Sequence, residues 1–257
     1  MKKNNIRKLL TRIERKPLLS DRFHTATNNK AISQIDMKDM PQSWTKINFK
    51  TYPRLNKIYL TDKKPKDKKL GLLMSSRRSV RQFSGLPISW RQLSYLLFSS
   101  AGLLNVNNSI DYSRRPYPSA GARYPLEIYP LILNCTGIDK GLYHYNVKEN
   151  CLELILKEDL EVWLMKASGG EASLRQSSII FIITGVLDRT RIKYRDRGYR
   201  YALIEAGHLG QNICLLTAEL GLGCCPLGGF IDPVVNELLD ISFQKEFVLY
   251  LLAVGTL

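Results

Sequence analysis

Two arginines and a serine occupy alternate positions in the segment Arg77-Arg78-Ser79-Val80-Arg81. In an extended backbone, side chains at alternate positions point to the same side, so Arg77, Ser79 and Arg81 would converge on one spot. Guanidinium groups bind phosphate oxygens through paired hydrogen bonds, and a hydroxyl group can donate one more. The spacing therefore predicts a clamp for a phosphomonoester, in which Arg78 would face away. The alternative is a solvated basic edge strand, which is the usual outcome for a charge run.

Three other segments carry residues that could contribute to a site. The loop 114–122 contains two prolines and several small residues, which would let its backbone come close to a flat ligand. The charged stretch 189–200 contains Lys193 and Tyr194 side by side. The stretch 223–230 is expected to form another loop. Each segment could equally be an ordinary surface connection, so spacing alone assigns none of them a function.

Helical periodicity predicts the elements that would position these segments. Ser89 and Gln92 have the spacing of a capping box, which predicts a helix that starts at Ser89 and ends at Gly102. The pattern over 201–220 is apolar on most faces, which is typical of a central helix. Further helices are expected over 158–166 and from 232 onward, with Asp232 as N-cap and Pro233 at the first helical position.

Strand signals lie between the expected helices. The run 178–186 is rich in β-branched residues and should be buried on both faces. The other expected strands are 126–133, the hairpin 142–145 with 152–156, and 247–254. Strands and helices are mixed without strict βαβ alternation, which favours an α+β fold.

Charge divides the chain into two parts. The 257 residues carry a net charge of +15, and residues 1–16 and 57–69 hold much of that surplus. We therefore expect residues 1–69 to be a basic N-terminal arm, with a helix over 1–16 and a short strand near 57–60. Residues 70–257 would form the main domain, because 44% of the chain is apolar and can build a sizeable core.

Composition also excludes several classes of protein. Five irregularly spaced cysteines argue against a disulfide framework, and three scattered histidines predict no metal site. No apolar run approaches the roughly 20 residues of a membrane span, and the N-terminus lacks a signal-peptide core. A cytoplasmic location is therefore expected. The basic charge favours anionic partners, but no nucleic-acid motif accompanies it, so no nucleic-acid partner is expected.

Four motifs in order resemble those of a known family. They are RRSVRQF (77–83), PSAGARYPLEIY (118–129), KYRDRGYRYALIEAGHLGQN (193–212) and GLGCCPLGGF (221–230). Together they resemble the nitroreductase-like flavoproteins and, among these, the SagB-type dehydrogenases, which include azoline oxidases of ribosomal peptide biosynthesis. The resemblance covers about residues 70–255. It implies an α+β fold with a central antiparallel or mixed sheet packed by helices, non-covalent FMN, and a homodimer with flavin sites at the subunit interface.

The resemblance also implies a role for individual residues. Arg77, Ser79 and Arg81 would contact the FMN phosphate, with Arg78 as a weaker contributor. The FMN-binding loop, contributed by the partner chain, would comprise Pro118, Ser119, Ala120 and Gly121. The stretch Leu227, Gly228 and Gly229 would bring the Gly228 N–H close to flavin N5, where it would favour the reduced flavin. The catalytic pair would be Lys193 and Tyr194.

The implied reaction is dehydrogenation of a thiazoline or oxazoline in a modified peptide to the thiazole or oxazole. Lys193 or Tyr194 would remove a proton, the flavin would accept a hydride, and oxygen would reoxidise the flavin. The substrate would be a peptide or a carrier-bound heterocycle, and a cyclodehydratase or another biosynthetic protein could be a partner.

Two other functions stay open at this point. An NAD(P)H-dependent nitroreductase or flavin reductase would keep the fold and the FMN but would not need the Lys-Tyr pair. A non-catalytic basic binding protein would explain the charge alone.

Overall fold

The computed structural model describes residues 19–27, 69–104, 114–242 and 245–257. The expected helix over 1–16 and strand near 57–60 lie outside these residues. The described helices are α2 (Leu19–Thr27), α4 (Lys69–Ser76), α5 (Trp90–Ala101), α6 (Glu161–Ala167), α7 (Asp188–Tyr194), α8 (Arg197–Glu219) and α9 (Asp232–Leu239), with 3-10 turns η3 (Ala120–Ala122) and η4 (Ala172–Gln176). The strands are β1 (Ile88–Ser89), β2 (Leu126–Ile132), β3 (Cys135–Thr136), β4 (Gly141–Asn146), β5 (Cys151–Leu156), β6 (Ile179–Val186), β7 (Leu222–Leu227) and β8 (Glu246–Thr256).

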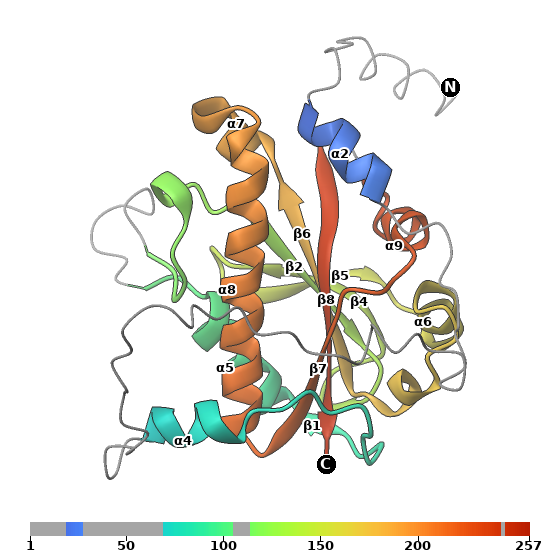
Figure 1. Cartoon of the computed structure of the whole chain (residues 1–257). Helices are drawn as coiled ribbons and strands as arrows, with labels where there is room; N and C mark the ends of the chain where they lie inside the picture. Colours follow the sequence, from blue (N-terminus) through green and yellow to red (C-terminus); the bar gives the residue numbers. More distant parts are fainter. Residues whose placement is uncertain (1–18, 28–68, 105–113, 243–244) are drawn as a thin grey trace, which may run out of the picture.

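A six-stranded antiparallel sheet in the order β5-β4-β2-β6-β8-β7 forms the centre of the fold. Helices α5 and α8 cover one face, and α6 and α9 lie on the other (Figure 1). Because side chains alternate along a strand, β6 contributes residues to the hydrophobic clusters on both faces of the sheet. Ile179, Phe181 and Ile183 pack toward α5 and α8, whereas Ile180 and Ile182 pack toward α6 and α9. The predicted α+β fold with a central sheet is confirmed.

The locally encoded elements agree with the sequence. Ser89 caps α5, its hydroxyl accepts the Gln92 N–H, and the Gln92 side chain accepts the Ser89 N–H at 2.8 Å, which completes the capping box. Gly102 ends the helix. The hairpin of β4 and β5 and the buried strand β6 are also present.

Two local predictions were wrong, and one stretch without a predicted element is helical. The stretch 223–230 is largely strand rather than loop, because β7 pairs along its whole length with β8; Pro226 is tolerated because β7 is an edge strand. No element was predicted over the charged stretch 189–200, which forms most of α7 and the start of α8. Ile231 rather than Asp232 is the N-cap of α9, so Pro233 lies one position further into the helix.

Helix α8 is the longest described element, with 23 residues. At a rise of 1.5 Å per residue it spans about 33 Å. Its buried stripe packs on the sheet and on α5. Helix α7 lies at its N-terminal end, and α4 lies at its C-terminal end (Figure 1).

Candidate functional site

The predicted phosphate clamp follows α4 and runs beside β7. Ser79 forms a parallel bridge with Cys224, and the Val80 N–H donates to the Cys224 carbonyl at 2.9 Å. The Val80 side chain points toward β7, because a Cβ placed on Gly223 would lie 2.9 Å from Val80 Cγ1. Ser79 and Arg81, on either side of Val80, therefore point away from the protein. This local geometry agrees with the predicted extended conformation over 79–81, whereas the Arg77 N–H donates to the Leu73 carbonyl at 2.9 Å and belongs to the end of α4.

The clamp arginines have side chains available for an anion. Arg78 and Arg81 are exposed and Arg77 is half-buried. Within the described part of the chain, none of the three has an ion-pair partner. Unpaired guanidinium groups gathered at one place are what a phosphate site requires.

Gly228 and Gly229 follow β7 directly. Both are exposed, and a Cβ added to either would meet nothing within 4 Å, so the backbone here is open to a ligand. Cys224 contacts the clamp, and Gly228 lies four residue steps further along the chain, a distance of about 13 Å in an extended backbone. Strand β7 therefore places the predicted clamp segment and an accessible backbone surface along one line, an arrangement with room for an elongated ligand.

The structure places Lys193 and Tyr194 on α7, directly against the loop 118–121. A Cβ placed on Gly121 would lie 2.6 Å from Tyr194 Oη and 3.2 Å from Lys193 Nζ. Lys193 Nζ lies 5.3 Å from the centroid of the Tyr194 ring, and this ring packs edge-on against Tyr201 at 5.1 Å. Two segments 72 residues apart, from Gly121 to Lys193, thus meet in one chain. The absence of a side chain at Gly121 is what allows this contact.

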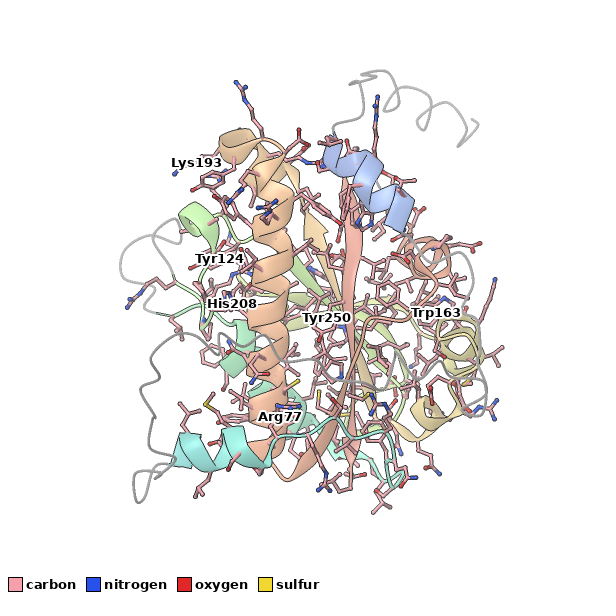
Figure 2. The ribbon with its side chains drawn as sticks, viewed as in Figure 1. Arg77, Tyr124, Trp163, Lys193, His208 and Tyr250 are labelled. Atoms are coloured by element: carbon pink, nitrogen blue, oxygen red, sulfur yellow. The ribbon has the colours of Figure 1, made fainter. Side chains whose placement is uncertain are left out.

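The predicted site residues form two separate groups. Lys193 lies at the N-terminal end of α8 and Arg77 at its C-terminal end (Figure 2). Because α8 spans about 33 Å, the clamp and the Lys-Tyr pair of the same chain are far apart. The structure therefore places the clamp beside β7, which leads to Leu227, Gly228 and Gly229, and places the pair against Gly121 of the loop that also contains Pro118, Ser119 and Ala120, but it does not join the two groups.

A buried carboxyl group lies beneath the loop, and the sequence analysis missed it. Glu205 on α8 is 2% exposed, and neither of its carboxylate oxygens has a hydrogen bond within the described residues. Burial raises the pKa of Glu205 to about 7, while the neighbouring Ser119 hydroxyl and Arg115 act in the opposite direction. Ser119 Oγ accepts the Tyr124 N–H at 2.8 Å, which leaves the Ser119 proton free to point at Glu205. The sequence feature that could have indicated this buried carboxyl group is an acidic residue within the apolar stripe of the helix.

The cysteines behind the clamp are thiols. Cys214 on α8 and Cys224 on β7 are buried, with their sulfur atoms 3.6 Å apart. A hydrogen bond from Cys224 lowers the pKa of Cys214, and the charge of Arg77 contributes in the same direction. All five cysteines are free, as the irregular spacing predicted.

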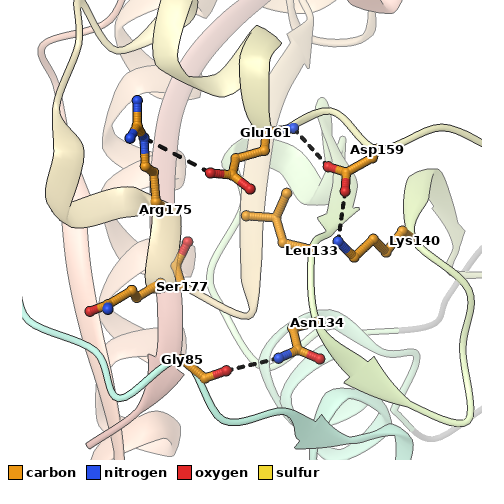
Figure 3. A pocket seen from close by; sticks show the side chains of 9 residues that line it. Gly85, Leu133, Asn134, Lys140, Asp159, Glu161, Arg175 and Ser177 are labelled. Atoms are coloured by element: carbon orange, nitrogen blue, oxygen red, sulfur yellow. Dashed lines mark hydrogen bonds and ion pairs between the residues drawn. The ribbon is translucent and has the colours of Figure 1, made fainter.

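A surface pocket lies away from both groups, near α6 and η4 (Figure 3). Its polar groups are already paired: Lys140 with Asp159 at 2.6 Å and Asn134 with the Gly85 carbonyl at 2.8 Å. The residues that line it are Gly85, Leu133, Asn134, Lys140, Asp159, Glu161, Arg175, Gln176 and Ser177. None of the predicted site residues is among them, so this pocket is not the site.

The chain belongs to the nitroreductase family, whose family model matches residues 74–256. MJ1384 of Methanocaldococcus jannaschii, which carries the nitroreductase name, is 36% identical over 187 residues, covering 73% of this chain and 90% of MJ1384. The microcin B17-processing protein McbC of Escherichia coli is 32% identical over 134 residues, covering 50% of this chain and 49% of McbC. The trifolitoxin-processing protein TfxB of Rhizobium leguminosarum is 27% identical over 144 residues, covering 54% of this chain and 39% of TfxB. The chain thus spans half or less of both processing proteins.

Solved structures agree on the fold. The E. coli microcin synthetase McbBCD complex with truncated pro-MccB17 bound contains a chain that matches with a TM-score of 0.72 and 22% identity, over 92% of this chain and 91% of that one. A nitroreductase structure from Anabaena variabilis matches with a TM-score of 0.62 and 31% identity, over 73% of this chain and 38% of that one. The resemblance to nitroreductase-like and SagB-type proteins is confirmed.

Proteins of this family generally bind a flavin, and the residues present here fit one. The unpaired clamp arginines match its phosphate, and the open backbone at Gly228 and Gly229 can lie against a flat ring. Among the described residues, no cluster of acidic, histidine or cysteine side chains could hold a metal ion. In the same part of the chain, no helix is both long enough and apolar enough to cross a membrane.

Proposed function

We propose that this protein is an FMN-dependent dehydrogenase of the SagB type, which oxidises a thiazoline or oxazoline in a modified peptide to the corresponding azole. The observation that carries the proposal is the placement of Lys193 and Tyr194 against Gly121 of the expected flavin loop. A reductase that needs only hydride transfer has no need of two proton-bearing side chains there. The relation to McbC and TfxB, which process microcin B17 and trifolitoxin, supports a peptide substrate.

In this proposal, each group of residues has one task. Arg77, Ser79 and Arg81 hold the FMN phosphate, and the open backbone at Gly228 and Gly229 lies against the ring. Bound FMN supplies the hydride acceptor. Tyr194 Oη and Lys193 Nζ both lie over Gly121, so either can reach a proton of a heterocycle held against this loop.

The separation of the two groups along α8 favours a homodimer. A single flavin cannot contact Arg77 and Lys193 of the same chain, because about 33 Å of helix lies between their positions. One protomer would supply the clamp, and its partner would supply the loop and the Lys-Tyr pair. The exposed side of α8 is suited to such a contact, since Ile204 is 52% exposed, Leu203 is also exposed, and Gly207 leaves open space beside them.

The central test replaces Lys193→Ala and Tyr194→Phe separately. Turnover of an azoline peptide, followed by oxygen uptake and by mass, should fall at least about 100-fold in one or both variants. The flavin absorbance should persist, because the clamp is untouched. Ile192→Ala is the matched control: this residue lies on the same helix, is 79% exposed, and should keep full turnover. Normal turnover in both Lys193→Ala and Tyr194→Phe would refute the assignment.

A second candidate function is an NAD(P)H-dependent nitroreductase acting on small molecules. The observation in its favour is the 36% identity to MJ1384, which extends over 90% of that protein. Anaerobic mixing with NADPH distinguishes the two functions: rapid bleaching of the flavin absorbance supports the reductase, and its absence supports the dehydrogenase. A colourless protein that takes up no FMN would instead support a non-catalytic basic binding protein.

The protein is expected to act together with another biosynthetic protein. The McbBCD match covers 92% of this chain, compared with 73% for the Anabaena protein. A broader fold match to a component of a peptide-modifying complex favours a cyclodehydratase or a related biosynthetic protein as partner. The substrate would then be a peptide or a carrier-bound heterocycle presented by that partner.

A further inference from the structure

We infer that helix α2 is a positioning element for the catalytic segment: its Ser20, Asp21 and His24 hold α7 and the start of α8 so that Lys193 and Tyr194 point at the flavin loop. The inference rests on the proposed function for the role of the pair. Helix α2 ends at Thr27, well before residue 74, where the match to the nitroreductase family begins. It therefore lies outside the part of the chain that the family model describes.

The first contact joins α2 to both sides of the turn between α7 and α8. The Ser20 N–H and hydroxyl donate to Asp196 Oδ1 at 3.2 and 2.8 Å. Arg191 Nη2 donates to Ser20 Oγ at 3.0 Å and forms an ion pair with Asp21. One short helix thus binds the last turn of α7 and the residue that precedes α8.

The second contact anchors α2 to α8 and to the sheet. The ring of His24 stacks on Phe247 of β8 with centroids 4.2 Å apart, and its Nδ1 lies 2.9 Å from Tyr199 Oη. His24 is 5% exposed, and burial lowers its pKa to about 4, so the ring is neutral near pH 7. The stacking on Phe247 fixes α2 against the rigid core, which lets it act as a support.

Arg191 shows why α7 depends on this support. Arg191 is only 8% exposed, and a buried guanidinium requires an anionic partner. Within the described residues, Asp21 is the carboxylate paired with it. Lys193 follows two residues later, about 200° around the helix, and is exposed. Helix α2 therefore binds α7 on the side of Arg191, whereas Lys193 projects from the opposite side.

The turn after α7 adds a reason for external support. Arg195 has φ 49° and ψ −135°, an uncommon conformation for a residue with a side chain. Such a conformation persists only where neighbouring contacts impose it. The contacts of Ser20 with Asp196 and Arg191, on either side of Arg195, meet this requirement.

The test uses the full-length protein with the double change Ser20→Ala and Asp21→Asn, and separately His24→Phe, which keeps the stacking on Phe247. Arg22→Ala is the control, because Arg22 lies on the exposed side of the same helix. We expect azoline turnover to fall by about 10-fold or more in the double variant, since small displacements of catalytic groups are costly. FMN affinity should stay unchanged, because the clamp lies at the other end of α8. Amide hydrogen exchange over 188–196 should accelerate in the double variant and not in the control.

Each alternative result has a clear meaning. Unchanged exchange over 188–196 in both test variants would overturn the inference. So would a parallel loss of FMN, thermal stability and turnover, which indicates a general structural role. If the double variant does not fold, the same measurements of turnover, FMN affinity and hydrogen exchange on His24→Phe decide whether α2 positions α7. If the unaltered protein oxidises no azoline, the proposed function fails, and the exchange experiment still decides whether α2 supports α7.

Discussion

Gly121 offers a sharp test of the proposed site. It has φ +61°, and a Cβ at this position would lie 2.6 Å from Tyr194 Oη and 3.2 Å from Lys193 Nζ. Ordinary contacts of a Cβ begin near 3.4 Å, so Gly121→Ala must displace the Tyr194 hydroxyl by roughly 1 Å. A misplacement of that size can cost about 100-fold in rate. We therefore expect Gly121→Ala to lower azoline turnover about 100-fold.

Backbone strain must be separated from this collision. Alanine at a left-handed position costs roughly 1–2 kcal/mol, whatever its surroundings. Gly221 is the matched control, because it has φ +67° and open space around its Cβ position. Gly221→Ala should introduce the same backbone strain and lower the Tm by several degrees. Its turnover should be unchanged.

The assay compares both variants with the unaltered protein by oxygen uptake with an azoline peptide, flavin absorbance and thermal unfolding. The expected pattern is a similar loss of stability in both, but loss of turnover only in Gly121→Ala. Equal turnover in the two variants would show that the contact between the loop and the Lys-Tyr pair has no part in the reaction.

Two further predictions concern the clamp and the buried carboxyl. Arg77→Ala with Arg81→Ala should weaken FMN binding by about 100-fold or more in a folded protein, because each charged hydrogen bond contributes about 1.5–3 kcal/mol. Mixing this variant with a Lys193→Ala, Tyr194→Phe protein should restore about a quarter of the activity, since half of the dimers would have one intact site; no recovery would refute shared sites. The raised pKa of Glu205 should contribute stability that is complete below pH 4.5 and is lost, by about 3 kcal/mol, as pH rises from 4.5 through 7; Glu205→Gln should lack this part of the pH dependence in urea titrations.

The control for the clamp is Arg91→Ala. Arg91 is an exposed arginine on α5, outside the clamp, and its loss should leave FMN affinity unchanged. If Arg91→Ala weakened binding as much as the clamp variant, the effect would come from net charge rather than from a phosphate site.

The sequence by itself determined those features that depend on near neighbours in the chain. The capping box of Ser89 and Gln92 joins residues three apart, and the apolar run of β6 needs no partner to be recognised. The residue types at alternate positions of the clamp also predict phosphate binding, because the direction of side chains along an extended backbone is a local property, and this stays a prediction.

Only the tertiary structure decided features that depend on residues distant in sequence. The stretch 222–227 became a strand because β8 supplies a partner, despite its cysteines and proline. Glu205 gains its raised pKa from burial under a loop 86 residues away, at Ser119, and Asp21 finds its partner Arg191 170 residues along the chain. Periodicity and propensity describe interactions over a few residues, whereas these contacts arise from the packing of the whole domain. Tertiary packing likewise sets the positions of the clamp and of Lys193 at opposite ends of α8, and this separation is the reason for the second protomer in the proposed site.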